Sequence, residues 1–281
     1  MASTDTALTA DWLGACRRAV TGLTGVLAAA PTTVQRARET GTRGSGGDRT
    51  LEIDSAAEAA VLSELEALHA DGLHFTALSE ERGEIDFGGG GVRVIIDPID
   101  GSLNAKRDAL HYALSIAVAD GDTMANVVFA FVHDFGAGEQ WWAQRGEGAW
   151  RDGQPLDPSL PERRTADGRL ELLGIESADP RWLQASIEPL VAGAHRIRAL
   201  GTIAATLCQV AAARFDGMVT LRRCRGVDAA AGQLIVREAG GLVAFTDCAT
   251  PLGAPLDATP SSYLVAARTA ETLAQLTEIP A

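Results

Sequence analysis

Apolar runs, separated by polar and glycine-rich segments, predict two helices in the first quarter of the chain. Alanine and leucine dominate residues 6–30, and no proline interrupts them before Pro31, which is typical of a helix. Residues 40–49 are polar and rich in glycine, so we expect a mobile loop there. The capping-box pattern of residues 55–58 (Ser-Ala-Ala-Glu) then predicts a second helix as far as about His69.

Shorter apolar runs in the middle of the chain predict strands. Residues 75–78 form one, and residues 94–96 are β-branched without interruption, which suits a strand buried on both faces. Pro98 has no N–H for strand pairing and should end this strand just after Asp97. Further antiparallel strands, the first two joined as a hairpin around residues 120–122, are expected at 113–119, 127–133, 140–143 and 148–150.

The polar, proline-bearing segment 157–168 is the expected boundary between two halves. We place an N-terminal α+β half at residues 1–160 and a C-terminal α/β half at residues 161–281, packed together as one compact unit. In the second half strands alternate with helices: strands at 170–175, 217–221, 242–245 and 263–267, and helices at 180–192, 202–214, 227–239 and the C-terminus. Such alternation around an antiparallel middle indicates a layered α/β (α+β) architecture.

Composition narrows the class of protein. The 281 residues are 46% hydrophobic, enough for a sizeable core, and the net charge of −13 argues against a nucleic-acid or anionic-membrane surface. We find neither a secretory signal pattern nor an apolar run of membrane-spanning length. The four cysteines are scattered without metal-site spacing, so reduced thiols in a cytoplasmic protein are expected.

One tight turn carries most of the candidate chemistry. Two carboxylates three residues apart can reach one side of such a turn, and Gly101 supplies the backbone freedom that it needs. Paired hard oxygen donors at the end of a strand suit Mg²⁺. The alternative is an ordinary Asp-Gly turn with solvated acids. The stretch reads Asp97-Pro98-Ile99-Asp100-Gly101-Ser102-Leu103-Asn104.

Four further acids become candidates for the same site because of this turn. Glu80 and Glu81 follow the strand at 75–78, and if that strand neighbours the strand at 94–96, three or four carboxylates meet in one crevice. Acids so crowded need a cation. Asp54 stands at a helix entrance and Asp228 just inside another helix start. Each of these acids also has a simpler explanation when taken singly. Glu80 and Glu81 could be solvated loop charges, Asp54 a helix cap, and Asp228 an acid favoured by the helix dipole.

Together these segments resemble the signature of the inositol monophosphatase family, which belongs to the lithium-sensitive, Mg²⁺-dependent phosphatases that include fructose bisphosphatases. The resemblance covers roughly residues 45–245. It implies a layered α-β-α-β-α sandwich of the sugar-phosphatase type, a phosphomonoesterase acting on a small polyol or sugar phosphate, and a homodimer. The matching segments are Glu80-Glu81, the turn at 97–104, Asp228-Ala229-Ala230-Ala231-Gly232 and Glu238-Ala239-Gly240-Gly241.

The resemblance also implies roles for single residues, with two or three Mg²⁺ per subunit. The first ion would be held by Glu80, Asp97 and the Ile99 carbonyl, and the second by Asp97, Asp100 and Asp228. Ser102, where the family usually has threonine, and Asp54 would orient and deprotonate the attacking water, so that the catalytic set is Glu80, Ser102 and Asp54. Glu81 would be a supporting acid, and the backbone of Gly101 and Ser102 would cradle the phosphate.

Departures from the family pattern concern the substrate. Ala105 and Val227 stand where an aromatic residue and a tryptophan are usual, and Leu221 where inositol-specific members have a carboxylate. Nearby cations could bind a second anionic group or could merely balance the acidic surface. Besides Gly101 and Ser102, the expected substrate-binding residues are Asn104, Lys106, Arg222 and Arg225, with Arg107 and Arg223 close by.

Inositol monophosphate, sugar bisphosphates such as fructose 1,6-bisphosphate, histidinol phosphate and phosphoadenosine phosphates therefore all stay open as substrates. Two other readings are kept. One is a non-catalytic homologue that binds a phosphorylated ligand, although binding alone would not need Asp54 or Ser102. The other is a phosphatase with an aspartyl nucleophile, which would leave a trappable phosphoenzyme.

Overall fold

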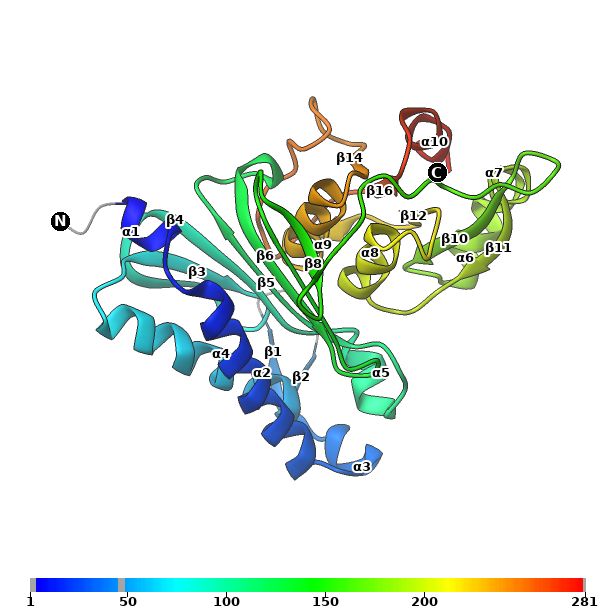
Figure 1. Ribbon diagram of the computed structural model, residues 1–281. Coiled ribbons are helices and arrows are strands. Elements are labelled where there is room, and N and C mark those ends of the chain that lie inside the picture. Colours follow the sequence, from blue (N-terminus) through cyan, green and yellow to red (C-terminus); the bar gives the residue numbers. More distant parts are fainter. Residues whose placement is uncertain (1–3, 45–48, 280–281) are drawn as a thin grey trace.

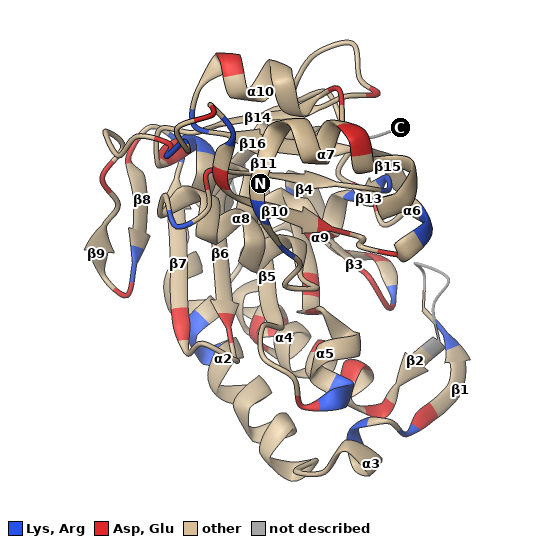
Figure 2. Ribbon diagram, turned by 90° about the vertical axis from the view of Figure 1, so that its right-hand side faces the viewer, with Lys and Arg blue, Asp and Glu red and all other residues tan. Residues whose placement is uncertain are grey.

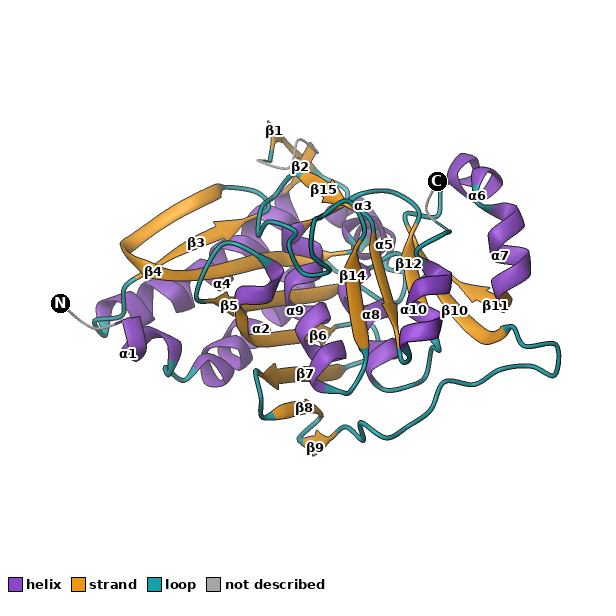
Figure 3. Ribbon diagram, turned by 90° about the horizontal axis from the view of Figure 1, so that it is seen from above, coloured by secondary structure: helices purple, strands orange, loops and turns teal. Residues whose placement is uncertain are grey.

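The chain stacks as five alternating layers in the computed structural model, which describes residues 4–44 and 49–279 (Figure 1). Helices α2 (Trp12–Ala29) and α4 (Glu52–Ala70) pack together against one face of a seven-stranded sheet. Helices α8 (Ile203–Ala211) and α9 (Gly226–Glu238) lie between this sheet and a five-stranded one, and α10 (Ala270–Leu276) packs on the latter's other face. Figure 3 views the same helices and strands from above. The predicted α-β-α-β-α sandwich is confirmed.

The seven-stranded sheet carries the strands predicted for the middle of the chain. A short 3₁₀ turn, η1 (Met124–Asn126), lies in the connection between the strands at 113–119 and 127–134. In sheet order the strands are β3 (Phe75–Ser79), β4 (Gly83–Asp100), β5 (Ala113–Ala119), β6 (Val127–Asp134), β7 (Glu139–Gln144), β8 (Gly148–Arg151) and β9 (Gln154–Pro155). Every pairing from β4 to β9 is antiparallel, which confirms the antiparallel arrangement predicted for β5 to β8.

Strand β3 pairs with both halves of the long strand β4. The first half runs antiparallel to β3, with Thr76 opposite Asp86, and the second half runs parallel, with Ser79 opposite Ile96. Four consecutive glycines, 88–91, all with positive φ, let the chain reverse between the halves. The carboxyl ends of β3 and β4 therefore lie at the same edge of the sheet, so that Glu80 follows one end and Asp97 lies at the other.

The five-stranded sheet mixes parallel and antiparallel pairs. Its order is β11 (Ala194–Arg198), β10 (Leu170–Glu176), β12 (Gly217–Thr220), β16 (Leu264–Ala267) and β14 (Leu242–Phe245). The first three strands are parallel, and β16 runs antiparallel to β12 and β14. Smaller elements complete the chain: α1 (Thr4–Leu8), α3 (Thr33–Arg36), β1 (Glu39–Arg43), β2 (Arg49–Leu51), α5 (Ser102–Arg107), α6 (Pro180–Ala185), α7 (Ile187–Gly193), β13 (Cys224–Arg225) and β15 (Pro260–Ser262).

Three apolar clusters hold the layers together. One fills the space between α2, α4 and the large sheet, a second surrounds α8 and α9, and a third lies under α10. Val94 and Ile96 belong to the first cluster and Ile95 to the second, which confirms a strand buried on both faces. Lys, Arg, Asp and Glu lie mainly in loops and at the ends of elements (Figure 2). Among the described residues, we find no helix long and apolar enough to cross a bilayer.

Two predicted helices are broken. The helix expected at 6–30 is interrupted before Asp11, whose side chain caps α2 by accepting from the Gly14 N–H at 2.9 Å. The helix expected at 180–192 divides into α6 and α7 at Ser186. The helix predicted from the capping box begins earlier, at Glu52. Its presumed capping acid, Glu58, instead accepts from Ser79 and from the Arg82 N–H, so the capping box is wrong.

The strand predictions need three corrections. The stretch 40–49 is not simply a loop, because β1 and β2 pair there as an antiparallel hairpin; residues 45–48 of that prediction lie outside the described residues. Strand β4 continues past Pro98 to Asp100, with irregular pairing to β5 between Asp97 and Asp100. Strands β9, β11, β13 and β15 were not predicted because each is short or polar. The boundary near residue 160 stays a prediction.

Candidate active site

Carboxylates from three separate parts of the fold meet at the shared edge of β3 and β4. Glu80 follows β3, Asp97 and Asp100 end β4, and Asp228 lies in the first turn of α9. Burial raises the pKa of Glu80 and of Asp97, and repulsion from Asp228 raises both further. Burial and the Asp228 carboxylate also raise the pKa of Asp100. The structure therefore brings together the side chains predicted to form one crevice.

The turn after β4 is held rigidly by hydrogen bonds. Asp100 Oδ2 accepts from Thr202 Oγ1 at 2.5 Å and from the Ala204 N–H at 2.7 Å, at the start of α8. Asp97 Oδ1 accepts from the Ile99 N–H at 3.0 Å. Asp97 Oδ2 is buried and has no hydrogen-bond partner within the part of the chain that the structure describes. Asp100 is thus held through one oxygen by two donors, while Asp97 presents an oxygen that lacks a donor.

Asp54 lies in the first turn of α4 and is also buried. Its Oδ2 accepts from the Leu51 N–H at 3.2 Å, whereas Oδ1 has no partner among residues 4–44 and 49–279. Burial raises the pKa of Asp54 to about 7 against the effect of that hydrogen bond, and the negative charges of Glu81 and Glu80 add to the rise. A carboxyl group with a pKa near neutrality can accept a proton from water.

Arg225 places a guanidinium between two of the acids. Its Nη1 donates to Glu80, Nε lies 3.1 Å and 3.2 Å from the two oxygens of Asp228, and Nη2 lies 3.0 Å from Asp228 Oδ1. Burial tends to lower the pKa of Arg225, but the carboxylates of Asp228, Glu80 and Asp97 outweigh it and keep the group charged. The sequence predicted Arg225 as a substrate ligand and did not predict these acid partners.

The donor set fits a hard divalent cation. Two buried carboxylate oxygens, Asp54 Oδ1 and Asp97 Oδ2, are without donors among the described residues, and burial, followed by repulsion between the carboxylates, raises the pKa of Glu80, Asp97 and Asp100. Carboxylate oxygens at such a density are what Mg²⁺ binds. In the present arrangement, however, no three Asp, Glu, His or Cys side chains of the described residues are placed to hold a metal. In this arrangement the Arg225 guanidinium contacts both Glu80 and Asp228.

A polar hollow of about 230 Å³ adjoins the acids. Arg223 is balanced there by Asp247, at 2.7 Å, and lies over the ring of Tyr263. Arg222 is exposed, and no acidic partner for it is found among the residues that the structure describes. The side chains around this hollow include Ser177, Ile203, Arg222, Cys224, Arg225 and Asp228. The hollow therefore offers an anion at least one cation that carries no ion pair.

Other predicted residues lie differently from expectation. The Asn104 amide donates to three backbone carbonyls, of Leu110, His111 and Leu200, so its Nδ2 is used in the scaffold instead of being directed to a substrate. Lys106 faces a separate hollow against α3, although its charge lowers the pKa of Asp54. These two contacts do not support the predicted substrate-binding roles of Asn104 and Lys106.

The remaining predicted residues surround the turn. Ser102 is exposed at the first position of α5, directly after Gly101. Glu81 accepts from Thr50 Oγ1 at 2.5 Å, which ties β2 to the site. Gly101 has a φ of +88°, and a Cβ there would lie 3.0 Å from the Gly201 carbonyl oxygen. A glycine is required at this turn for both reasons.

Three supporting residues were not predicted. Thr202 holds Asp100, and Glu176 accepts from Thr206 Oγ1 at 2.6 Å and from the N–H groups of Leu200 and Gly201, both at 3.0 Å. Glu58 anchors the residues after β3. The sequence signalled Thr202 only as a helix start and Glu58 only as a capping acid, and it gave no role to Glu176, because the partners of all three are distant along the chain.

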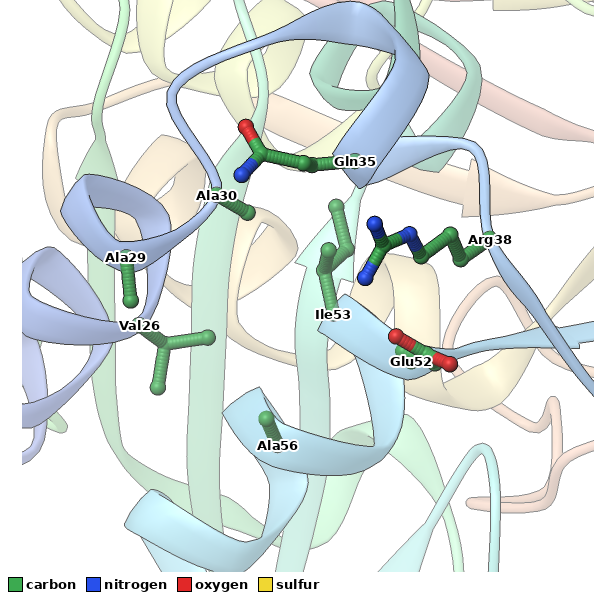
Figure 4. A pocket seen from close by; sticks show the side chains of 8 residues that line it. All are labelled: Val26, Ala29, Ala30, Gln35, Arg38, Glu52, Ile53 and Ala56. Atoms are coloured by element: carbon green, nitrogen blue, oxygen red, sulfur yellow. The ribbon is translucent and has the colours of Figure 1, made fainter.

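A second hollow, of about 260 Å³, lies between α2, α3 and α4 (Figure 4). Val26, Ala29 and Ile53 supply apolar side chains, and Arg38 and Glu52 supply charged ones. None of the six candidate acids lines it. It therefore lacks the carboxylate set that makes the other site a candidate for catalysis.

Comparison with known proteins gives a consistent answer. The inositol monophosphatase family matches residues 13–279. A Methanothermobacter thermautotrophicus protein named fructose-1,6-bisphosphatase/inositol-1-monophosphatase is 33% identical over 213 residues, covering 71% of this chain and 72% of that protein. A Haemophilus influenzae protein named Nus factor SuhB is 33% identical over 204 residues, covering 71% of this chain and 73% of that protein.

The fold has solved counterparts as well. A crystal structure of an inositol monophosphatase-fructose 1,6-bisphosphatase gene product matches with a TM-score of 0.79 at 23% identity, covering 96% of this chain and 100% of that one. At this identity the likeness concerns the fold.

Proposed function

This chain belongs to the inositol monophosphatase family, and on that premise we propose that it is a Mg²⁺-dependent phosphomonoesterase for a small polyol or sugar phosphate. The observation that carries the proposal is the convergence of buried acids with two carboxylate oxygens, of Asp54 and Asp97, that have no donor among the described residues. Buried acids without such a use would only destabilise the fold.

The proposed ligands of Mg²⁺ are Glu80, Asp97, the Ile99 carbonyl, Asp100 and Asp228, with Glu81 in support. Bound Mg²⁺ would lower the pKa of water and neutralise charge on the phosphoryl oxygens. The Thr202 and Ala204 hydrogen bonds hold Asp100 in one orientation, so that little reorganisation is needed during turnover.

Asp54 is the proposed general base. Its Oδ1 has no partner among the described residues, and its pKa of about 7 is matched to neutral solution, where a base can both accept and release a proton. Ser102 would orient the same water, and the backbone of Gly101 and Ser102 would cradle the phosphate. Water is then the nucleophile, in line with the leaving alkoxide, and no phosphoenzyme forms.

A bisphosphate is the second candidate substrate. It is favoured by Arg222, which carries no ion pair among the described residues and lines the hollow beside the acids. A sugar bisphosphate would place its second phosphate there, where a guanidinium binds an anion through two N–H groups. The relative named fructose-1,6-bisphosphatase/inositol-1-monophosphatase is consistent with either substrate.

Phosphate release from a panel of substrates tests the proposal. The panel holds inositol 1-phosphate, fructose 1,6-bisphosphate, histidinol phosphate and 3′-phosphoadenosine 5′-phosphate, each with saturating Mg²⁺ and again with a chelator. We expect chelator-sensitive turnover of at least one compound, and inhibition by lithium as in the family. Metal and ligand binding without any turnover would favour the non-catalytic homologue, and a trapped phosphoenzyme would favour the aspartyl mechanism.

Replacing Arg222 separates the two substrate classes. Arg222→Gln should raise the KM for the bisphosphate about tenfold and leave the monophosphate nearly unchanged, because only the bisphosphate has a second charge to bind. Arg223→Gln is the matched control, since Asp247 already balances Arg223. Equal effects of Arg222→Gln on both substrates would contradict a second phosphate position.

Three further expectations stay predictions: a homodimer, a cytoplasmic location and no nucleic-acid partner. The last is worth testing directly, because some relatives carry the name Nus factor SuhB. With a net charge of −13, the chain should give no change in fluorescence anisotropy of labelled RNA at physiological salt.

A further inference from the structure

Arg225 occupies the same carboxylates that the proposed metals would use. Its guanidinium joins Glu80, after β3, to Asp228, at the start of α9, through contacts from Nε, Nη1 and Nη2. Glu80 is a proposed ligand of the first ion and Asp228 of the second. A positively charged guanidinium and a divalent ion repel each other at such short range, so both cannot hold these oxygens together.

The charges at the site leave room for an exchange of cations. Glu80, Asp97, Asp100 and Asp228 bring four acidic side chains together, and the last three of these are buried. One arginine offsets a single charge and leaves Asp97 Oδ2 without a donor among the described residues. The Arg225 bridge therefore neutralises only part of the negative charge of the four acids. Two divalent ions would neutralise all of it.

The Arg225 side chain also has an adjoining hollow into which it can turn. Arg225 is 18% exposed and lines the 230 Å³ hollow that Arg222 and Ser177 share. A change of its side-chain rotamers towards this hollow would release Glu80 and Asp228 without moving β3 or α9. In that position the guanidinium would face the place proposed for the substrate's anionic groups.

We propose that Arg225 is a resident counter-cation: it bridges Glu80 and Asp228 in the metal-free protein, competes with the metal for them, and turns into the adjoining hollow when the metal binds. The inference rests on the proposed metal-dependent function. It makes Arg225 a positioning residue: it holds Glu80 and Asp228 in place before it contacts any substrate.

Titration calorimetry with Mg²⁺ alone, without substrate, tests the competition. Arg225→Gln should bind Mg²⁺ with a Kd about tenfold lower than the wild-type protein, because the metal no longer displaces charge-assisted hydrogen bonds. Arg225→Lys, which keeps the charge but cannot bridge two acids with a fork, should give a smaller decrease of about threefold. Arg223→Gln removes a charge from the same hollow and should change the Kd less than twofold.

Thermal unfolding in a chelator gives a second readout. Metal-free Arg225→Gln should melt at a lower temperature than the wild type, and Mg²⁺ should raise its melting temperature by more, since the buried acids have lost their resident cation. If this variant does not fold, Arg225→Lys carries the test alone.

The outcomes separate this inference from the proposed function. Wild-type protein that binds Mg²⁺ as tightly as Arg225→Gln, or more tightly, would overturn the competition and leave the phosphatase proposal intact. Wild-type protein that binds no Mg²⁺ even at millimolar concentration would overturn the metal chemistry and this inference together. Tighter binding in Arg225→Gln, with Arg223→Gln unchanged, is the result expected.

Discussion

Asp97 has a fully buried side chain, and its Oδ2 lacks a hydrogen-bond donor among the described residues. Its pKa is raised by burial first, and then by the negative charges of Glu80, Asp100 and Asp228. A carboxylate in such a place costs stability unless a cation accompanies it. At the scale of single residues, Asp97 therefore lowers the stability of the fold unless a cation binds beside it.

Asp97→Asn should separate stability from activity. We expect phosphate release to fall about 1,000-fold or more, because a charged oxygen ligand is lost, while the metal-free protein gains about 1 kcal/mol of unfolding free energy. Urea unfolding in a chelator and phosphate release with Mg²⁺ measure the two effects. Asp122→Asn, at a side chain 80% exposed, is the control and should change neither; near-normal turnover of Asp97→Asn would defeat the assignment.

Glu176 predicts a pH-dependent contribution to stability. Burial raises its pKa from the ordinary value of 4.5 to about 7, even though Thr206 and two backbone N–H groups donate to it. The folded state thus binds this proton more tightly than the unfolded state does. The associated stability is fully present below pH 4.5 and is lost as the pH rises through about 7.

Urea unfolding between pH 4.5 and 8 measures this contribution. Glu176→Gln removes the titrating group, so the unfolding free energy of the variant should fall less steeply over this range than that of the wild type. The changed hydrogen bonds of Glu176→Gln lower its unfolding free energy equally at every pH, so they do not affect the comparison of slopes. Parallel curves for the two proteins would show that Glu176 keeps an ordinary pKa.

At the scale of elements, the turn between β4 and α5 decides where the acids point. Asp100 is tied to Thr202 and Ala204 of the α8 start, and Asn104 is tied to carbonyls on both neighbouring segments. Gly101 allows the reversal between them with a φ of +88°. The short helix α5 therefore owes its position to long-range contacts more than to its own six residues.

Gly101→Ala should test how tightly the turn is packed. An added Cβ would lie 3.0 Å from the Gly201 carbonyl oxygen and 3.2 Å from the His111 carbonyl oxygen, besides straining the backbone. We expect a loss of about 3 kcal/mol in unfolding free energy and a strong loss of turnover.

Gly138→Ala is the matched control for that change. Gly138 also has a positive φ, of +68°, but nothing lies within 4 Å of an added Cβ. Its loss should be about 1 kcal/mol, from backbone strain alone. Chemical denaturation of both variants gives the comparison, and equal losses would mean that the neighbours of Gly101 yield easily.

At the scale of the whole molecule, Arg268 connects the segment after the large sheet to the second sheet. Its guanidinium donates to the carbonyls of Pro158 and Leu160 and also to those of Ala211 and Ala239, at the ends of α8 and α9. Four backbone acceptors from three parts of the chain thus converge on one buried cation.

Arg268→Met should therefore be strongly destabilising. Removal of the guanidinium leaves several buried carbonyls without a donor, and we expect a loss of about 3 kcal/mol in unfolding free energy by urea denaturation. Arg181→Met is the control, since Arg181 forms only an exposed pair with Asp179 and should hardly change stability. A loss no larger than that of the control would remove Arg268 from the connection between the sheets.

The sequence alone determined the layered fold and the acid set. Short apolar runs separated by polar segments placed β3, the second half of β4 and β5 to β8 correctly, because side-chain burial in a strand depends on a local pattern. The grouping of Glu80 with Asp97 followed from two apolar runs that each end in acids. These predictions succeeded because the signal lies within a few neighbouring residues.

Tertiary structure alone decided the partners of those acids. Arg225 bridges Glu80 and Asp228, Glu58 accepts from Ser79 where a capping box was expected, and Asn104 is used by the scaffold. Except for the Arg225–Asp228 pair, these contacts join distant groups: Glu80 and Arg225 lie 145 residues apart, Asn104 and Leu200 lie 96 apart, and Glu58 and Ser79 lie 21 apart. A sequence fixes which charges exist, but only packing determines which of them meet, because the energy of an ion pair depends on distance and burial in the folded chain.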